Sequence, residues 1–130
     1  MLVWGALACG TAMSQERGRQ LFDGTIALPG TITGHAAPLA PRASRCINCH
    51  AVESTAASAA ASFGPPLTAA SLTSRVSRRR GPPSLYDEAS FCSLLRTGVD
   101  PAFIVAAQTM PRYAASDADC RDLWRYLVGS

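Results

Sequence analysis

The sequence predicts an all-α domain of three to five helices. The clearest sign is a stretch near the end of the chain in which apolar residues recur at intervals of three and four, as on one face of an α-helix. These residues are Cys120, Leu123, Trp124, Leu127 and Val128. The length of 130 residues suits one domain, and the apolar share of 48% is enough for a packed core.

Capping residues mark the ends of three expected helices. Ser116 precedes the apolar stretch and is expected to cap the last helix through its side-chain oxygen. A middle helix is expected to begin at Ser84 and to end at Gly98, since glycine commonly ends helices. A first, short helix is expected from Ser14 to about Phe22. We find no internal repeat.

The segment between the first helix and the middle of the chain has a different composition. Residues 23–44 are rich in Gly, Pro and Thr, and they predict a long loop or a small ribbon. In the ribbon, residues 25–28 and 31–33 would flank the turn at Pro29-Gly30.

The motif Cys46-Ile-Asn-Cys49-His50 carries the most chemical information. Zinc needs four ligands, and no second Cys or His pair stands at the spacing of a zinc finger. A redox-active dithiol of the thioredoxin kind would need a strand before the motif, where this chain has a Pro-rich loop. A covalently attached haem explains all three residues, because two thiols bond to the porphyrin and the next imidazole binds its iron.

In this and three other landmarks the chain resembles the class I c-type cytochromes, over roughly residues 14–128. The landmarks appear in the family's order as GRQLF, CINCH followed by GPPL at 64–67, TMPRY, and LWRYL. The resemblance implies a cytochrome c-like fold around one covalently attached haem c. It also implies that Leu123 and Tyr126 cross Gly18 and Phe22, with glycine allowing the two helices to approach closely.

The resemblance assigns the residues of the haem site. Cys46 and Cys49 would carry the thioethers, His50 and Met110 would be the axial iron ligands, and the carbonyl of Pro65 would accept the proton of the His50 ring.

Two features of the chain complicate this assignment. A competing sixth ligand is His35, which would give a bis-histidine haem. The chain also has no Trp between His50 and Met110, where the family has one near a haem propionate. Tyr86 or an arginine of the 75–80 loop is expected to take that role.

The function expected from these assignments is a periplasmic electron carrier and not an enzyme. A His/Met pair fills the axial positions of the iron, and the chain shows no nucleophile–base pair. Its partners would be a donor dehydrogenase and an acceptor oxidase or cytochrome. Two alternatives are a haem subunit of a larger dehydrogenase or oxidase, with residues 23–44 as a docking element, and a ligand-binding or sensor haem with an open sixth position.

The four arginines between Arg75 and Arg80 form the strongest local charge. They are expected either to help dock an acidic redox partner or to lie in solvent, with one arginine reaching a propionate. The net charge of +3 is too small to indicate nucleic-acid binding.

Three cysteines lie outside the haem motif. Cys92 and Cys120 each fall on the apolar side of an expected helix, and an oxidising compartment would allow a disulfide between them. Residues 1–13 are expected to be the remnant of a signal peptide or of a lipoprotein signal, with residues 14–130 as the cytochrome domain. Cys9 would be acylated or removed, so a membrane is expected only if Cys9 is acylated.

Overall fold

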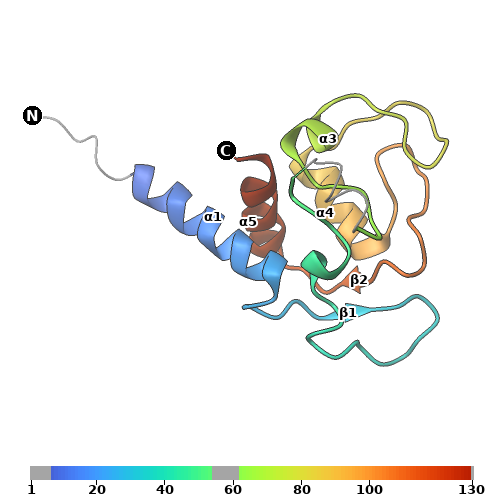
Figure 1. The fold of residues 1–130 in the computed structure, drawn as a ribbon, viewed down its shortest axis with the longest axis horizontal. Helices are drawn as coiled ribbons and strands as arrows, with labels where there is room; N and C mark the ends of the chain where they lie inside the picture. Colours follow the sequence, from blue (N-terminus) through green and yellow to red (C-terminus); the bar gives the residue numbers. More distant parts are fainter. Residues whose placement is uncertain (1–6, 54–61, 130) are drawn as a thin grey trace, which may run out of the picture.

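The structure is a computed structural model that describes residues 7–53 and 62–129, and these form a helical domain with a small sheet. Within this part of the chain the elements are the helices α1 (Leu7–Asp23), α3 (Ala69–Thr73), α4 (Glu88–Thr97) and α5 (Asp117–Val128), the 3₁₀ turn η1 (Cys46–Asn48), and the strands β1 (Gly30–Thr31) and β2 (Arg112–Tyr113). α1 and α5 lie against one another, and long loops fill the opposite side (Figure 1). The expected helical domain is therefore confirmed for the described residues.

The first helix begins before Ser14, so the prediction that Ser14 is its N-cap is wrong. α1 already includes Leu7, because residues 7–13 contain the helix-forming residues Leu, Ala and Met. The Ser14 hydroxyl instead donates a hydrogen bond to the Asp122 carboxylate of α5. The expected boundary between residues 13 and 14 therefore lies inside a helix, whereas residues 1–6 of the expected signal are outside the described residues.

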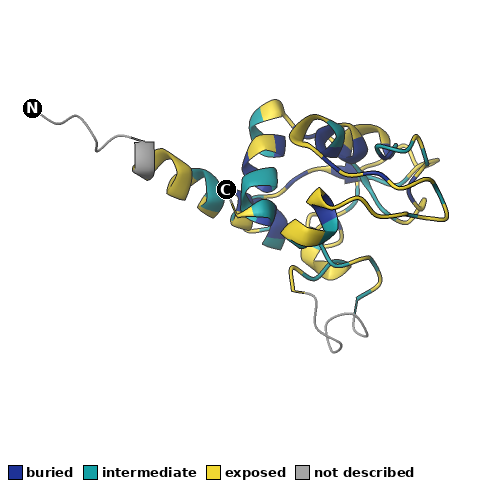
Figure 2. Cartoon of the chain, turned by 90° about the horizontal axis from the view of Figure 1, so that it is seen from above, coloured by how far each residue is buried: buried dark blue, intermediate teal, exposed yellow. Residues whose placement is uncertain are grey.

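The start of α1 extends away from the body of the protein. Residues 9–13 are exposed, and the helix becomes partly buried only where it reaches α5 (Figure 2). Among the helices of the described residues, none is long and apolar enough to cross a membrane.

α1 and α5 cross at Gly18, as expected. A Cβ atom at Gly18 would lie 2.0 Å from the backbone oxygen of Asp122 and 2.7 Å from the Cβ of Tyr126, so no larger residue fits without movement of a helix. Beyond the crossing, the rings of Phe22 and Tyr126 pack with their centroids 5.7 Å apart. Leu123 is almost completely buried beneath the crossing.

The cap predictions for the later helices are partly right. Ser116 caps α5, and Gly98 ends α4 in the left-handed conformation with φ of 75°, both as predicted. The N-cap of α4 is Asp87 and not Ser84. Ser84 lies outside the helix because its backbone pairs with that of Val76 in an antiparallel bridge.

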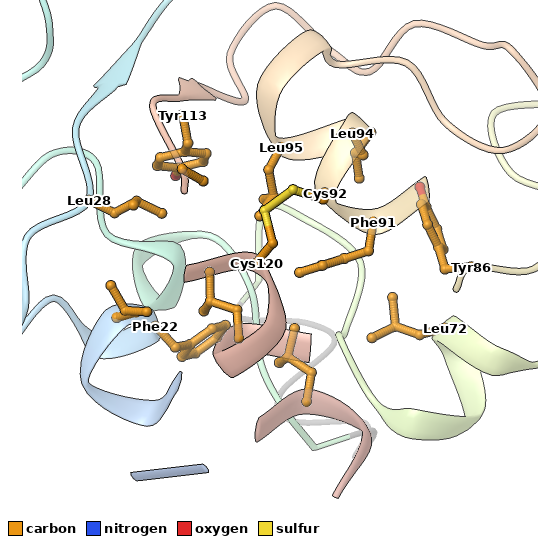
Figure 3. Close-up of a cluster of buried hydrophobic side chains, with 14 of the residues drawn as sticks. Phe22, Leu28, Leu72, Tyr86, Phe91, Cys92, Leu94, Leu95, Tyr113 and Cys120 are labelled. Atoms are coloured by element: carbon orange, nitrogen blue, oxygen red, sulfur yellow. A yellow bond between two sulfur atoms is a disulfide. The ribbon is translucent and has the colours of Figure 1, made fainter. Parts of the chain in front are cut away.

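The core lies between α4 and α5, which a disulfide joins (Figure 3). Cys92 of α4 and Cys120 of α5 are bonded with an S–S distance of 2.01 Å, and both are buried, so the predicted disulfide is confirmed. Next to the disulfide, the rings of Phe91 and Trp124 pack with their centroids 5.5 Å apart.

The sheet pairs two segments that are far apart in the sequence. Gly30 lies opposite Tyr113 and Thr31 opposite Arg112, so the expected ribbon within residues 23–44 does not form with its own neighbours. Gly30 allows this pairing, because a Cβ atom there would lie 2.9 Å from the Cβ of Pro111.

Replacing both Cys92 and Cys120 by Ala is expected to lower the free energy of unfolding by about 3–4 kcal/mol, because the bond restricts the unfolded chain across a long loop. The two residues are 28 positions apart. Urea titration measures the change. Cys9→Ala is the control, since Cys9 is an exposed free thiol. A loss below about 1 kcal/mol in the double variant would show that the disulfide stabilises little.

Gly18→Ala is expected to lower the free energy of unfolding by about 1–3 kcal/mol, because its methyl group would overlap the backbone of α5. Gly10→Ala is the matched control on the same helix, where nothing lies within 4 Å of the added Cβ. Alanine should there be neutral or stabilise by up to about 1 kcal/mol. Equal effects of the two substitutions in thermal or urea unfolding would contradict the close crossing.

Candidate haem site

The Cys-x-x-Cys-His motif forms a single compact turn. Residues 46–48 make up η1, and the backbone N–H groups of Cys49 and His50 both donate to the carbonyl of Cys46, at 3.1 and 3.0 Å. Cys46 is half-buried and Cys49 is exposed, and both are free thiols, unlike the bonded pair of the core. The turn therefore holds two unpaired thiols and an imidazole within five consecutive residues.

The imidazole of His50 is oriented by a backbone carbonyl. Its Nδ1 atom lies 2.8 Å from the carbonyl oxygen of Pro65, which can only accept a hydrogen bond, so Nδ1 carries the proton and Nε2 keeps its lone pair. Burial lowers the pKa of His50, while the bond to Pro65 acts in the opposite direction. A neutral imidazole with a free Nε2 is the form that binds iron.

Gly64 lets the chain pass close to this ring. A Cβ atom at Gly64 would lie 2.4 Å from Cε1 of His50. Two backbone hydrogen bonds hold the segment in place, from the N–H of Gly64 to the carbonyl of Cys49 and from the N–H of Leu67 to the carbonyl of Ala51, both at 2.7 Å. The Gly-Pro pair noted in the sequence therefore has two physical roles, since glycine makes room for the ring and proline supplies the acceptor.

Cys46 packs against the core cluster that contains Tyr113, near the end of the chain. Burial raises the pKa of its thiol to about 11, while the nearby Tyr113 acts in the opposite direction. The Tyr113 hydroxyl donates to the carbonyl of Ser44 at 2.8 Å, and burial raises the pKa of Tyr113 above its usual value. Because Tyr113 belongs to β2, this bond and the core packing bring the segment that carries Met110 towards the motif.

The two candidates for the sixth ligand lie in different surroundings. Met110 is half-buried and packs against the core, and its backbone N–H donates to Ala107 at 3.1 Å. His35 is exposed on the loop after β1, with its backbone N–H bonded to Ile32 at 3.0 Å. Burial against the same core that Cys46 contacts favours Met110.

Three of the four clustered arginines form hydrogen bonds within the fold, including Arg75, which donates to the carbonyl of Pro83 at 3.1 Å. Arg78 donates to the carbonyls of Ser84 and Ser71, both at 2.5 Å, and its guanidinium lies 4.7 Å from the centroid of the Tyr86 ring. Of the other members of the cluster, Arg75 and Arg80 are exposed.

Arg79 forms an ion pair with Asp100 at 2.5 Å, and the side chain of Asp100 is fully buried. Burial raises the pKa of Tyr86, while the nearby Arg79 acts in the opposite direction. Docking of an acidic partner by this cluster stays a prediction. The replacement of the missing Trp by Tyr86 or a neighbouring arginine stays a prediction.

No group of three or more His, Cys, Asp or Glu side chains within the described ranges could hold a metal ion. No family model matches the chain, and no curated protein or solved structure matches it either.

Arg79→Gln is expected to lower the free energy of unfolding by about 1–3 kcal/mol, because the buried carboxylate of Asp100 would lose its charged partner. The neighbouring Arg80 is exposed, so Arg80→Gln should change stability by less than about 0.5 kcal/mol. Urea titration of both variants makes the comparison. Equal stability of both variants and the parent would mean that the cluster serves only as surface charge.

Proposed function

We propose that this chain is a class I c-type cytochrome that carries one covalently attached haem c and transfers single electrons between proteins. The observation that carries the proposal is the hydrogen bond from the His50 ring to the carbonyl of Pro65, which leaves Nε2 free. The resemblance predicts this bond, which joins His50 to a residue 15 positions later in the chain.

Each residue of the proposed site has a separate task. Cys46 and Cys49 would hold the haem through two thioethers, His50 would supply a nitrogen ligand to its iron, and Met110 would supply a sulfur ligand. Pro65 keeps the imidazole in one orientation and one tautomer. When bound, the haem supplies an iron that exchanges one electron, and a soft thioether ligand raises its reduction potential.

The packing around the motif supports a cytochrome c-like fold. The close crossing at Gly18 and the contact between Phe22 and Tyr126 join the first and last helices as the resemblance expects. Cys46 and Met110 both pack against the core cluster that contains Tyr113. His50 and Met110 lie on two separate loops, from which they would supply the two iron ligands.

The proposed location is the periplasm. Haem is attached to c-type cytochromes outside the cytoplasm, and the disulfide between Cys92 and Cys120 is typical of an oxidising compartment. The proposed partners are a donor dehydrogenase and an acceptor oxidase or cytochrome. Cys9 is exposed near the start of α1, so its thiol is accessible for acylation.

Met110→Ala tests both the haem and its ligands. The chain is produced together with a haem c attachment system, and the parent is expected to keep haem through denaturation and to show the weak far-red band of an iron–thioether bond in the ferric state. Met110→Ala should retain the haem, lose the band, and bind carbon monoxide readily in the ferrous state, because the sixth position is then open.

Two controls separate the alternatives. Cys46→Ser with Cys49→Ser should abolish covalent haem, whereas His35→Ala should leave the far-red band unchanged. Rapid carbon monoxide binding by the parent would favour a sensor or ligand-binding haem. Loss of the low-spin state in His35→Ala, and not in Met110→Ala, would identify His35 as the ligand.

A further inference from the structure

The guanidinium of Arg112 bridges the loop that carries Met110. Its Nη1 atom donates to the carbonyl of Met110 at 2.7 Å, and its Nη2 atom donates to the carbonyl of Ala106 at 3.1 Å. One planar, permanently charged group therefore binds both ends of the segment from residue 106 to residue 110. Arg112 is half-buried, which limits the access of water to these bonds.

Gly98 provides the space for this side chain. A Cβ atom at Gly98 would lie 2.1 Å from Nε and 2.2 Å from Cζ of Arg112, so the guanidinium lies directly against the end of α4. Gly98 also has φ of 75°, a conformation that favours glycine. Its carbonyl accepts a hydrogen bond from the N–H of Ala106 at 2.7 Å. The start of the loop is thus attached to α4 at the point where Arg112 packs.

The backbone of Arg112 is itself fixed. It lies in β2 opposite Thr31, and the neighbouring Tyr113 is buried and bonded to the carbonyl of Ser44. The N–H of Ala114 donates to the carbonyl of Pro29 at 2.9 Å. The side chain of Arg112 therefore extends from a strand that both backbone and side-chain hydrogen bonds hold in place.

From this geometry we infer that Arg112 is the positioning residue for the sixth iron ligand. The inference rests on the proposed function. Arg112 holds the carbonyl of Met110 at a fixed place, and the thioether of Met110 extends from the same residue. Without this bridge, the loop spends a larger fraction of time with Met110 displaced from the iron. The apparent dissociation constant of an external ligand falls in proportion as this open fraction rises.

The test measures the apparent dissociation constant of imidazole for the ferric holoprotein at one pH and one salt concentration. Arg112→Gln is expected to lower this constant by about tenfold, because the open fraction rises. Arg112→Lys keeps the charge but has no planar fork to bridge two carbonyls, so its constant should fall between the parent and Arg112→Gln. The far-red band should weaken in the same order.

Arg96→Gln is the matched control. Arg96 of α4 also donates to a backbone carbonyl, that of Ala115 at 2.8 Å, and it pairs with Asp117 of α5 at 2.7 Å, so these bonds reach the start of α5 and not residues 106–110. Arg96→Gln should change the apparent dissociation constant of imidazole by less than about twofold. This holds even if the unfolding midpoint of Arg96→Gln falls as far as that of Arg112→Gln. If Arg112→Gln yields no holoprotein, Arg112→Lys is compared with Arg96→Gln in the same assay.

The outcomes distinguish this inference from the proposed function. A far-red band in the parent with an unchanged imidazole constant in both Arg112 variants would overturn the role of Arg112 and leave the function intact. Equal changes in the Arg112 variants and Arg96→Gln would show a general loss of stability and would also overturn it. A parent that holds no haem, or that lacks a band dependent on Met110, would refute the proposed function itself.

Discussion

The close crossing of α1 and α5 at Gly18 is the constraint on which the rest of the structure depends. Because no side chain separates the two backbones there, Phe22 can pack on Tyr126 and Leu123 can be buried beneath them. Charged groups on the other side of the crossing are paired as well. The buried carboxylate of Asp122 accepts hydrogen bonds from Ser14 and Arg17, the latter at 2.8 Å. The helix pair is therefore held by apolar packing on one side of Gly18 and by hydrogen bonds on the other.

Both parts of the candidate site are attached to this helix pair. The disulfide at Cys120 joins α5 to α4. Gly98, the C-cap of α4, accepts a hydrogen bond from the N–H of Ala106 at the start of the Met110 loop. From α1, the chain turns at Gly24, where φ is 85° and the side chain of Arg45 packs 2.3 Å from the position of an added Cβ. Arg45 directly precedes the cysteine motif. A change at the crossing would therefore move both loops, although neither loop belongs to a helix.

Local patterns in the sequence were sufficient for the parts of the fold that depend on neighbouring residues. The face and cap of α5, the end of α4 at Gly98 and the placement of Cys92 and Cys120 all follow from helical periodicity and cap chemistry. Two of the failures have the same cause, which is a partner far along the chain. Ser14 resembles an N-cap, but its hydroxyl bonds to α5. The strand at Gly30 pairs with residues more than eighty positions later, which no local pattern could indicate.

Local sequence patterns were also insufficient for part of the candidate site. The sequence indicated the side chains that could bind haem, because those residue types and spacings are unusual. The carbonyl of Pro65 was expected from the resemblance, but the other backbone carbonyls that fix the site were not. His50 is held by the carbonyl of Pro65, Tyr113 by that of Ser44, and Arg112 holds the carbonyl of Met110.

Because every residue has a backbone carbonyl, the sequence does not indicate which carbonyl accepts a given hydrogen bond unless glycine or proline shapes the backbone around it. At Gly64-Pro65 both residue types are present, and the resemblance to the c-type cytochromes predicted the Pro65 carbonyl as the acceptor for His50. Next to Met110 the chain has Pro111, but the space for Arg112 comes from Gly98 on another element, and no local pattern predicted that contact. Two irregular loops are therefore each fixed by one side-chain donor: the His50 ring bonds to the carbonyl of Pro65, and the Arg112 guanidinium bonds to the carbonyl of Met110.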